Sequence, residues 1–303
     1  MFSRKAAILS LLVLSLFARE PLQKMEEEVF KANINTLLVF TSQDGLNTGR
    51  YHFNSIGMTM DVMHLPFLYH LPTHGSYNYF ILGNAGYSRV YLIEPNDESL
   101  LTHDNHVQTY TAGLGGGIRY FYNLHLSFLG GVEIIYSRAG ISVKPKDPLG
   151  DALEDLFNAN YNDNVTYKLM ARMKYENRYK RYRPYCVLDL DAFDTKSSFT
   201  FKSLSQFKSQ SSVLTLSTGI ESPSLQNFGK NYLTLEGYYH YNRLFGTIKD
   251  IVKFNDYNNV GAVLYYYTPG TPDFASRFFF EVNSVFSYGL EGYNAGVGFS
   301  MNF

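Results

Sequence analysis

The sequence contains almost no cysteine and no tryptophan. Its one cysteine is Cys186, so an intramolecular disulfide cannot form and stability must come from burial or from pairing between strands. Beyond residue 18 no apolar run approaches the length of about 18 residues that a membrane-spanning helix requires. The 26 Lys and Arg residues nearly balance the 27 Asp and Glu residues. The basic excess that is typical of nucleic-acid-binding proteins is therefore missing, and we expect no nucleic-acid partner.

The first residues have the pattern of an export signal. Arg4 and Lys5 precede an apolar run from Ala6 to Ala18, which is too short to cross a bilayer as a helix. Ala18 is the predicted cleavage point, and no cysteine follows it that could carry a lipid anchor. We predict that residues 1–18 are a signal peptide and that the mature chain is a periplasmic, secreted or outer-membrane protein.

The sequence is rich in aromatic residues, although its mean hydropathy is slightly polar. Tyr and Phe number 26 and 24, and together they make up 17% of the chain. Apolar and polar residues alternate over stretches of about 10 to 12 residues, which is typical of transmembrane strands with one face toward lipid. We therefore predict an all-β fold, a transmembrane antiparallel up-and-down β-barrel of about 12 strands with a short N-terminal helix.

The alternation predicts a strand in each of twelve segments, and the barrel as a whole occupies residues 34–303. An even number of strands with a periplasmic C-terminus places the longer connections 93–106, 139–164, 194–210 and 244–256 outside the cell. Segment 196–203 is assigned to an outer loop, and 63–76 becomes a long periplasmic turn. The predicted strands are 34–42, 51–62, 77–92, 107–121, 124–138, 165–178, 183–193, 211–221, 231–243, 257–267, 276–287 and 292–303.

The last strand alternates up to the final residue. Tyr293, Phe299, Met301 and Phe303 share one face, and small or polar residues occupy the other. A terminal strand of this kind resembles the signal by which the assembly machinery of the outer membrane recognises barrels. The alternative is an edge strand of a soluble sandwich, which would gain nothing from an exposed terminal aromatic.

Charged residues share one face of the predicted strands 165–178 and 183–193, and we expect that face to line the lumen. A charge on the lipid side at the bilayer midplane would cost about 2–4 kcal/mol. The signs are mixed, which favours a charge-paired network, although a charged constriction stays an alternative. The predicted lumen charges are Arg119, Glu133, Lys168, Arg172, Lys174, Asp189, Asp191, Glu236 and Glu281, with Glu221 and Arg277 on the same faces.

A row of glycines is predicted to leave room in the lumen. Gly113, Gly115 and Gly117 share the inward face of one strand. Residues 19–33 could occupy that room, because their apolar residues recur at helical spacing. This helix is either a periplasmic lead-in or a plug whose acidic residues 26–28 meet the basic row of Lys168, Arg172 and Lys174.

The histidines give little support for catalysis. His103 and His106 flank Asp104 in a predicted outer loop, but no third metal ligand is apparent. Glu236 and His240 share a face at about 13 Å on a strand, too far apart for a direct hydrogen bond. We predict no catalytic, metal-binding or cofactor-binding residue, no cofactor, and no enzymatic activity. The alternatives are an outer-membrane hydrolase that uses His240 or another histidine at the mouth of the lumen, and an exported soluble β protein that binds an apolar ligand.

The export signal, the short helical lead-in, the segment LPFLYHLPTHGSYNYFILGNAGYSRV and about twelve strands together resemble a family. They are similar to solitary autotransporter-type β-barrels, which look like autotransporter translocators without a passenger. The short stretch between Ala18 and the first predicted strand leaves no space for a passenger domain. The resemblance implies a barrel in the outer membrane of a Gram-negative bacterium, with no catalytic residues to transfer. We expect a narrow or plugged conduit or a structural envelope component. Its expected partners are outer-membrane lipids, lipopolysaccharide and the barrel assembly machinery, and we expect a monomer.

Overall fold

The chain forms a closed antiparallel β-barrel. The computed structural model describes residues 31, 46–92, 106–142, 161–199, 206–269 and 276–300. Its barrel strands are β1 (Leu46–Phe53), β2 (Met58–His70), β3 (Tyr77–Leu92), β4 (His106–Phe121), β5 (Leu126–Ser142), β6 (Tyr161–Glu176), β7 (Arg183–Phe199), β8 (Lys208–Glu221), β10 (Asn231–Gly246), β11 (Asp256–Tyr267), β12 (Arg277–Ser287) and β13 (Leu290–Ser300). These twelve strands confirm the predicted fold class at the level of a twelve-stranded barrel.

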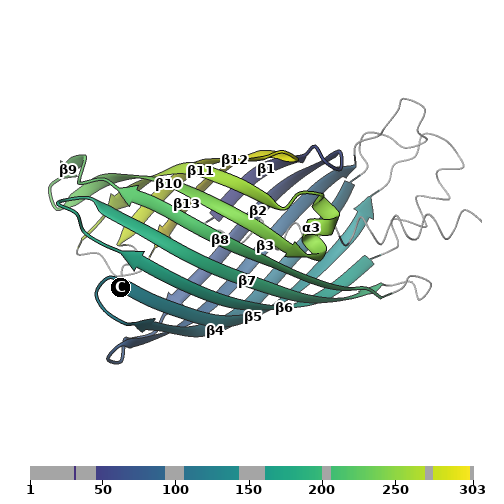
Figure 1. Cartoon of the computed structure of the whole chain (residues 1–303), viewed down its shortest axis with the longest axis horizontal. Coiled ribbons are helices and arrows are strands. Elements are labelled where there is room, and N and C mark those ends of the chain that lie inside the picture. The colour runs from purple at the N-terminus through teal and green to yellow at the C-terminus, as the bar shows by residue number, and fades with distance from the viewer. Residues whose placement is uncertain are drawn as a thin grey trace, which may run out of the picture.

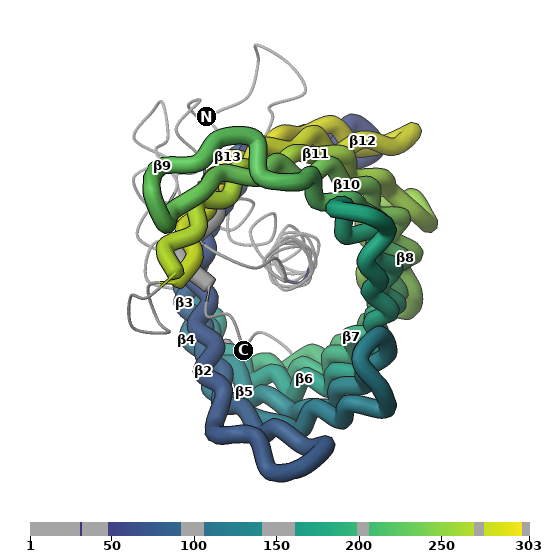
Figure 2. Tube along the Cα trace, turned by 90° about the vertical axis from the view of Figure 1, so that its left-hand side faces the viewer, coloured from purple at the N-terminus to yellow at the C-terminus, as the bar shows by residue number. Residues whose placement is uncertain are grey.

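Each barrel strand pairs with the next, and the last strand pairs with the first. Leu46 lies opposite Val297, so β1 and β13 join the two edges of the sheet. Figure 2, viewed along the barrel, shows the resulting closed ring. The short strand β9 (Gln226–Phe228) pairs only with β10 and extends the hairpin between β8 and β10 at one end (Figure 1). Because the ring is closed, the barrel strands leave no open sheet edge.

The two ends of the barrel differ. The connections from β3 to β4, from β5 to β6, from β7 to β8 and from β10 to β11 all leave from one end, which we call the loop end (Figure 1). Strand β13 finishes at the other end, which we call the C-terminal end. The four connections that the sequence assigned to one side therefore do share one side.

The first predicted strands have the wrong boundaries. The predicted strand 51–62 is interrupted by a tight turn at residues 54–57, where Gly57 has a φ of +61°. The buried residues are odd-numbered before the turn, at Tyr51 and Phe53, and even-numbered after it, at Met58 and Met60, so the alternation changes phase at the turn and the prediction of one strand overlooked this break. Strand β2 then continues to His70, which removes the long turn predicted at 63–76.

Other boundaries differ less. The predicted strand 34–42 lies outside the described residues. Strand β7 continues to Phe199, so part of the predicted outer loop 196–203 is strand. The helix α3 (Thr247–Val252) occupies a predicted loop and ends where Lys253 adopts a left-handed conformation. No helix among the described residues is long and apolar enough to cross a membrane.

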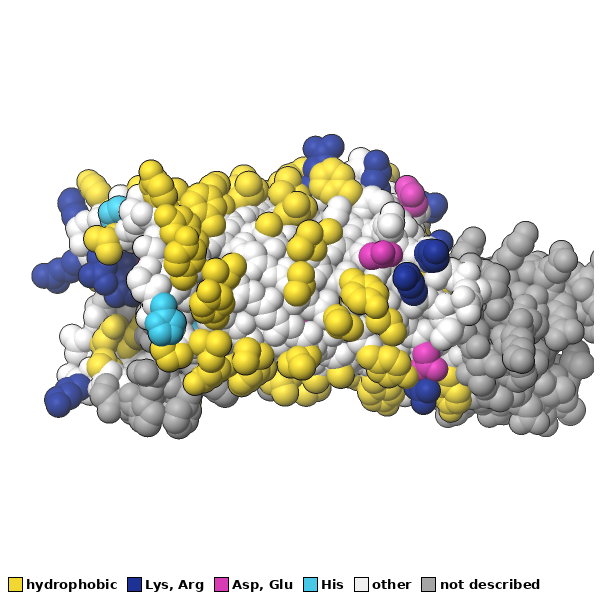
Figure 3. Space-filling view, turned by 90° about the horizontal axis from the view of Figure 1, so that it is seen from below, with side chains coloured by type: hydrophobic (Ala, Val, Ile, Leu, Met, Phe, Trp, Pro, Cys, Tyr) yellow, Lys and Arg dark blue, Asp and Glu magenta, His cyan; other side chains and the backbone are white. Residues whose placement is uncertain are grey.

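The two faces of the sheet have different side chains. On β4 and β5 the outward residues Leu114 and Val132 are 68% and 59% exposed, whereas the inward residues Val107 and Ile135 are buried. Figure 3 shows apolar side chains spread along the outer wall, with charged side chains gathered toward the two ends. The wall therefore has the apolar outer belt that a barrel presents to lipid.

Candidate functional site in the barrel lumen

The basic row on β6 lies on the interior face and is paired with carboxylates. Lys168 Nζ lies 3.0 Å from Asp191, and Arg172 Nε lies 2.6 Å from Asp189. Both aspartates come from the neighbouring strand β7, where the register places them beside the row. Aspartates of the adjacent strand thus neutralise the charges of Lys168 and Arg172.

Further contacts extend this network on both sides. Lys174 Nζ lies 2.6 Å from a carboxylate oxygen of Glu176, two residues along the same strand. On β5, Glu133 is buried opposite Lys168 and accepts a hydrogen bond from the side-chain amide of Asn84. The network therefore runs from β3 to β7, and the contribution of Asn84 was not predicted from the sequence.

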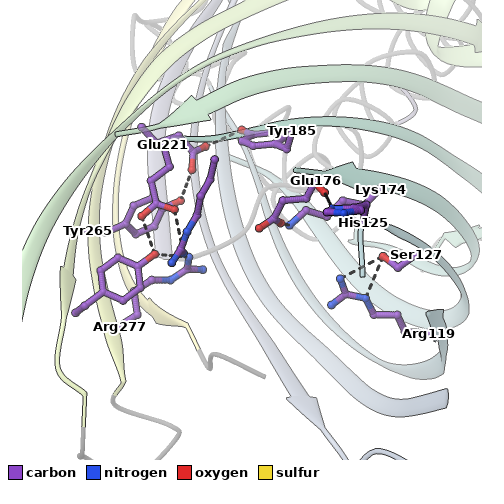
Figure 4. Close-up of polar contacts among 12 residues, drawn as sticks. Arg119, His125, Ser127, Lys174, Glu176, Tyr185, Glu221, Tyr265 and Arg277 are labelled. Atoms are coloured by element: carbon purple, nitrogen blue, oxygen red, sulfur yellow. Dashed lines mark hydrogen bonds and ion pairs between the residues drawn. The ribbon is translucent and has the colours of Figure 1, made fainter. Parts of the chain in front are cut away.

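Arg119 lies on the same side of the lumen, and its side-chain hydrogen-bond acceptor among the described residues is a neutral hydroxyl group. Its Nε and Nη2 atoms donate to the hydroxyl oxygen of Ser127 at 3.4 and 3.2 Å (Figure 4). Its guanidinium also stacks over the ring of Phe121, 4.7 Å from the centroid. In Figure 4 this group lies near Lys174 and Glu176 on one side of the lumen.

The opposite wall carries a row of three glutamates that phenol groups hold in place. Glu221 of β8 lies opposite Glu236 of β10, and the register continues through Val263 of β11 to Glu281 of β12. We call these carboxylates and their phenol donors the glutamate–tyrosine row. The donors are Tyr267 to Glu221 at 2.8 Å, Tyr185 and Tyr265 to Glu236 at 2.6 and 3.1 Å, and Tyr238 to Glu281.

Two arginines border the glutamate–tyrosine row. Arg183 Nη1 lies 3.7 Å from a carboxylate oxygen of Glu221. Arg277 lies over the rings of Tyr265 and Tyr267, at 4.5 and 5.8 Å from their centroids (Figure 4). The sequence placed the glutamates and Arg277 inward but gave no role to the tyrosines. Their pairing depends on cross-strand register, which alternation along one strand does not reveal.

The inward glycines do not leave an empty space. A side chain on Gly113 would meet Asn84 and Glu133, and one on Gly117 would meet the ring of Phe80. Next to Gly115 the backbone of Val132 lies directly in the way. The volume that the glycines vacate is thus filled from the neighbouring strands, which corrects the expectation of free room.

Buried apolar side chains gather in the loop half of the interior, and we call this set the apolar layer. Its members lie on β1 to β5, β7, β8 and β10 to β13, on both sides of the ring, and on α3. They include Met60, Val90, Val107, Ile135, Phe193, Phe207, Val213, Leu244, Ile248, Val252, Tyr257, Val285 and Leu290.

The helix α3 joins the apolar layer to the neighbouring turns. Ile248 and Val252 of α3 are fully buried. The Ser55 hydroxyl in the β1–β2 turn donates to the carbonyl oxygen of Val252 at 2.5 Å, and the rings of Phe53 and Phe254 stack 6.4 Å apart. The helix is therefore fixed to the first hairpin of the barrel.

One residue of the predicted N-terminal helix is described. Lys31 is helical, and its Nζ lies 5.8 Å from the ring centroid of Phe207. Phe207 precedes β8 at the loop end and belongs to the apolar layer. The rest of segment 19–33, including the acidic residues 26–28, lies outside the described residues.

The remaining predicted residues are placed only in part. Tyr293 lies on the outward face of β13 and is 62% exposed, and Phe299 lies opposite Phe278 in the register. Met301 and Phe303 lie outside the described residues, as does His103. His106 lies in strand β4, within hydrogen-bonding distance of Arg89 and Gln108, and not in a loop.

The fold is similar to that of autotransporter translocator domains. The beta domain of the Bordetella autotransporter BrkA covers 84% of this chain and 97% of its own, at 8% identity and a TM-score of 0.57. The translocator domain of NalP from Neisseria meningitidis covers 95% and 99%, at 11% identity and the same TM-score. The transport unit of AIDA-I from Escherichia coli covers 90% and 97%, at 8% identity and a TM-score of 0.57.

These similarities confirm the predicted resemblance at the level of the fold. Together with the closed twelve-stranded barrel, they support the predicted location in the outer membrane. No family model matches the chain, and no curated protein matches it in sequence.

The prediction that the chain is not an enzyme does not stand. The structures similar to it include LpxR from Salmonella typhimurium, an outer-membrane enzyme, at 10% identity and a TM-score of 0.45. Similarity at that score carries no argument for an activity of this chain. The fold alone does not exclude catalysis, because one fold can carry unrelated functions.

Proposed function

We propose that this chain is an outer-membrane barrel that is closed at its loop end and acts as a plugged conduit or as a structural component of the envelope. The apolar layer is the observation that carries the proposal. It draws buried residues from both sides of the ring, including Val107 on β4 and Leu244 on β10. A continuous apolar layer across a lumen opposes the passage of water and ions.

Lys31 favours a plug over a periplasmic lead-in. It is helical and lies against Phe207, an inward-facing ring at the loop end. A lead-in confined to the C-terminal end would not reach this position. The predicted pairing of the helix with the basic row has less support, because Lys168 and Arg172 already have carboxylate partners.

The proposals on export, assembly and lipid contacts follow from the location in the outer membrane. Residues 1–18 direct export, the barrel assembly machinery recognises the face that carries Tyr293, Phe299, Met301 and Phe303, and the apolar belt contacts phospholipid and lipopolysaccharide. A monomer is sufficient because β1 and β13 of the same chain close the barrel.

Planar-bilayer conductance tests the closure. We expect the full-length barrel to conduct very little, and deletion of residues 21–32 behind an intact signal to raise conductance. Phe207→Ala should also raise it, because this change removes the ring beside Lys31. Phe245→Ala is the matched control, since Phe245 lies near the same end but is 39% exposed on the outer face.

Two results would contradict the proposal. An open conductance of the full-length barrel would exclude the closed loop end. A deleted barrel that assembles and conducts no more than the full-length protein would show that the N-terminal helix is not a plug.

A further inference from the structure

The two ends of the barrel carry different charges. At the C-terminal end the fully described connections between strands are residues 71–76, 122–125, 177–182 and 222–230. These connections contain four cations and no carboxylate, the cations being Arg178, Lys180, Arg181 and Lys230. At the loop end, by contrast, α3 carries both Lys249 and Asp250. Figure 3 shows the same asymmetry on one face of the barrel, with Lys, Arg and His side chains at the C-terminal end and both signs of charge at the loop end.

Three of these cations lie in the tight turn between β6 and β7, residues 177–182, which we call the basic hairpin. Tyr179 and Tyr182 close it with two backbone hydrogen bonds of 3.0 Å, so Lys180 and Arg181 form its tip. All three cations are exposed. Lys180 adopts a φ of +57°, a conformation that glycine and asparagine adopt at lower cost than other residues. A cation therefore occupies a position where the turn alone would favour a small neutral residue.

The cations of the basic hairpin form no ion pair with a carboxylate in the described part of the chain. The acidic residues at the neighbouring strand ends are Glu176 and Glu221. Lys174 lies 2.6 Å from Glu176, and Tyr267 donates to Glu221 at 2.8 Å. Like charges crowded into one short turn repel one another. An anionic group from outside the chain would offset this repulsion.

Aromatic and apolar side chains place the basic hairpin at the edge of the membrane. Tyr179 and Tyr182 are cross-strand neighbours that are 66% and 45% exposed, and they continue the outward face of β6 on which Tyr175 lies. In the adjoining turn between β4 and β5, Leu124 is 98% exposed, and the rings of His125 and Tyr175 lie 6.3 Å apart. Tyrosine is enriched where the acyl chains of a bilayer give way to headgroups. A fully exposed leucine also fits this level better than it fits bulk water.

We propose that the basic hairpin binds the headgroups of anionic phospholipids in the periplasmic leaflet of the membrane. The proposal rests on the outer-membrane location and on a C-terminal end that faces the periplasm. The lipid phosphate contacts Lys180 and Arg181, while Tyr179 and Tyr182 lie beside the glycerol and the upper acyl chains. Lipid is favoured over an acidic protein because the two tyrosines share their face with the apolar belt, so the tip between them lies beside the bilayer.

Native mass spectrometry of the folded full-length barrel tests this site with equimolar phosphatidylglycerol and phosphatidylethanolamine that carry the same acyl chains. The unmodified chain should bind phosphatidylglycerol in preference. Lys180→Asn should lower this preference about fivefold, because it removes one cation beside an anionic headgroup while asparagine keeps the left-handed turn. Lys253→Asn is the matched control and should leave the preference unchanged, since Lys253 has a φ of +63° but lies at the loop end. Heat-dependent migration on gels confirms that each variant is folded.

Four outcomes would overturn the proposal. Equal binding of the two phospholipids by the unmodified chain would exclude recognition of the headgroup charge. Equal effects of Lys180→Asn and Lys253→Asn would show that only net charge matters. Tighter binding of diphosphorylated lipid A that Lys180→Asn abolishes would move the site to the other leaflet, and binding of a polyglutamate peptide without any lipid preference would replace lipid with an acidic protein. Lipid selectivity does not depend on conductance, so failure here leaves the proposed closure of the loop end intact.

Discussion

Replacement of Lys168 by Met is predicted to destabilise the barrel strongly, because Lys168 pairs with the interior carboxylate of Asp191 and lies opposite that of Glu133. Its Nζ lies 3.0 Å from Asp191, and it lies opposite the buried Glu133 in the register. The Lys168 and Asp191 side chains are only 11% and 21% exposed. Methionine retains most of the volume of lysine, so the change removes the charge with little loss of packing.

The expected magnitude follows from the exposure of the pair. Removal of one partner of a fully buried pair costs about 3–5 kcal/mol. Since Asp191 keeps some contact with solvent, we expect a loss of about 2–3 kcal/mol for Lys168→Met. The pair of Arg172 and Asp189 has side chains that are 41% and 22% exposed. For Arg172→Met we therefore expect a loss of at most about 1 kcal/mol.

Urea unfolding of the barrel in lipid or detergent, followed by heat-dependent migration on gels, measures both variants. Adding Glu133→Gln and Asp191→Asn to Lys168→Met should restore most of the lost stability, because no unpaired carboxylate then remains. Equal losses for the Lys168 and Arg172 variants would refute the reasoning, and so would a triple variant no more stable than Lys168→Met.

Three further predictions concern packing, orientation and assembly. Gly117→Ala should cost about 1–3 kcal/mol in the same unfolding assay, because the added methyl group meets Phe80 and the backbone of Gly130. Gly130→Ala is the control and should be nearly neutral, because a methyl group there has open space. Similar losses for the two variants would show that the strands shift to accommodate the added methyl group. Protease added to intact cells should cleave within 143–160 or 200–205, the connections at the loop end, and cleavage only after permeabilisation would reverse the orientation. Phe303→Asp should lower the yield of folded barrel in membranes far more than Phe245→Asp, and equal, normal assembly of both variants would remove the argument for a terminal signal.

The faces of the strands could be predicted from the sequence because burial alternates with a period of two. Lys168, Asp191 and Glu236 fall on the polar side of strands whose other side is apolar, and the structure places all three in the interior. The beginning of the barrel was predicted wrongly although the sequence carries a signal. The buried residues are odd-numbered before the turn at 54–57 and even-numbered after it, and Gly57 adopts a positive φ in the turn, so the prediction of one strand over 51–62 overlooked a change of phase.

Contacts between side chains of different strands also could not be predicted from the sequence. Whether Tyr185 reaches Glu236 depends on the register of β7, β8 and β10 and on the space beside Gly219, where a side chain would collide with the Tyr185 hydroxyl. Helix α3 was missed for a related reason. It has only six residues, and its two buried side chains, Ile248 and Val252, gain their stability from the barrel mouth rather than from helical propensity.

The distribution of charge in the lumen argues against an ion-selective pore. A selective pore needs a ring of one sign at one height. Here Lys168 and Arg172 are neutralised by aspartates of the next strand, while Glu236 on the opposite wall is held by two phenol groups. Each of these charged groups is thus satisfied by its immediate neighbours, which fixes the strands in register and rigidifies the wall. The charged groups therefore belong to the polar contacts of the wall, and under the proposed function the barrier to solutes is the apolar layer at the loop end.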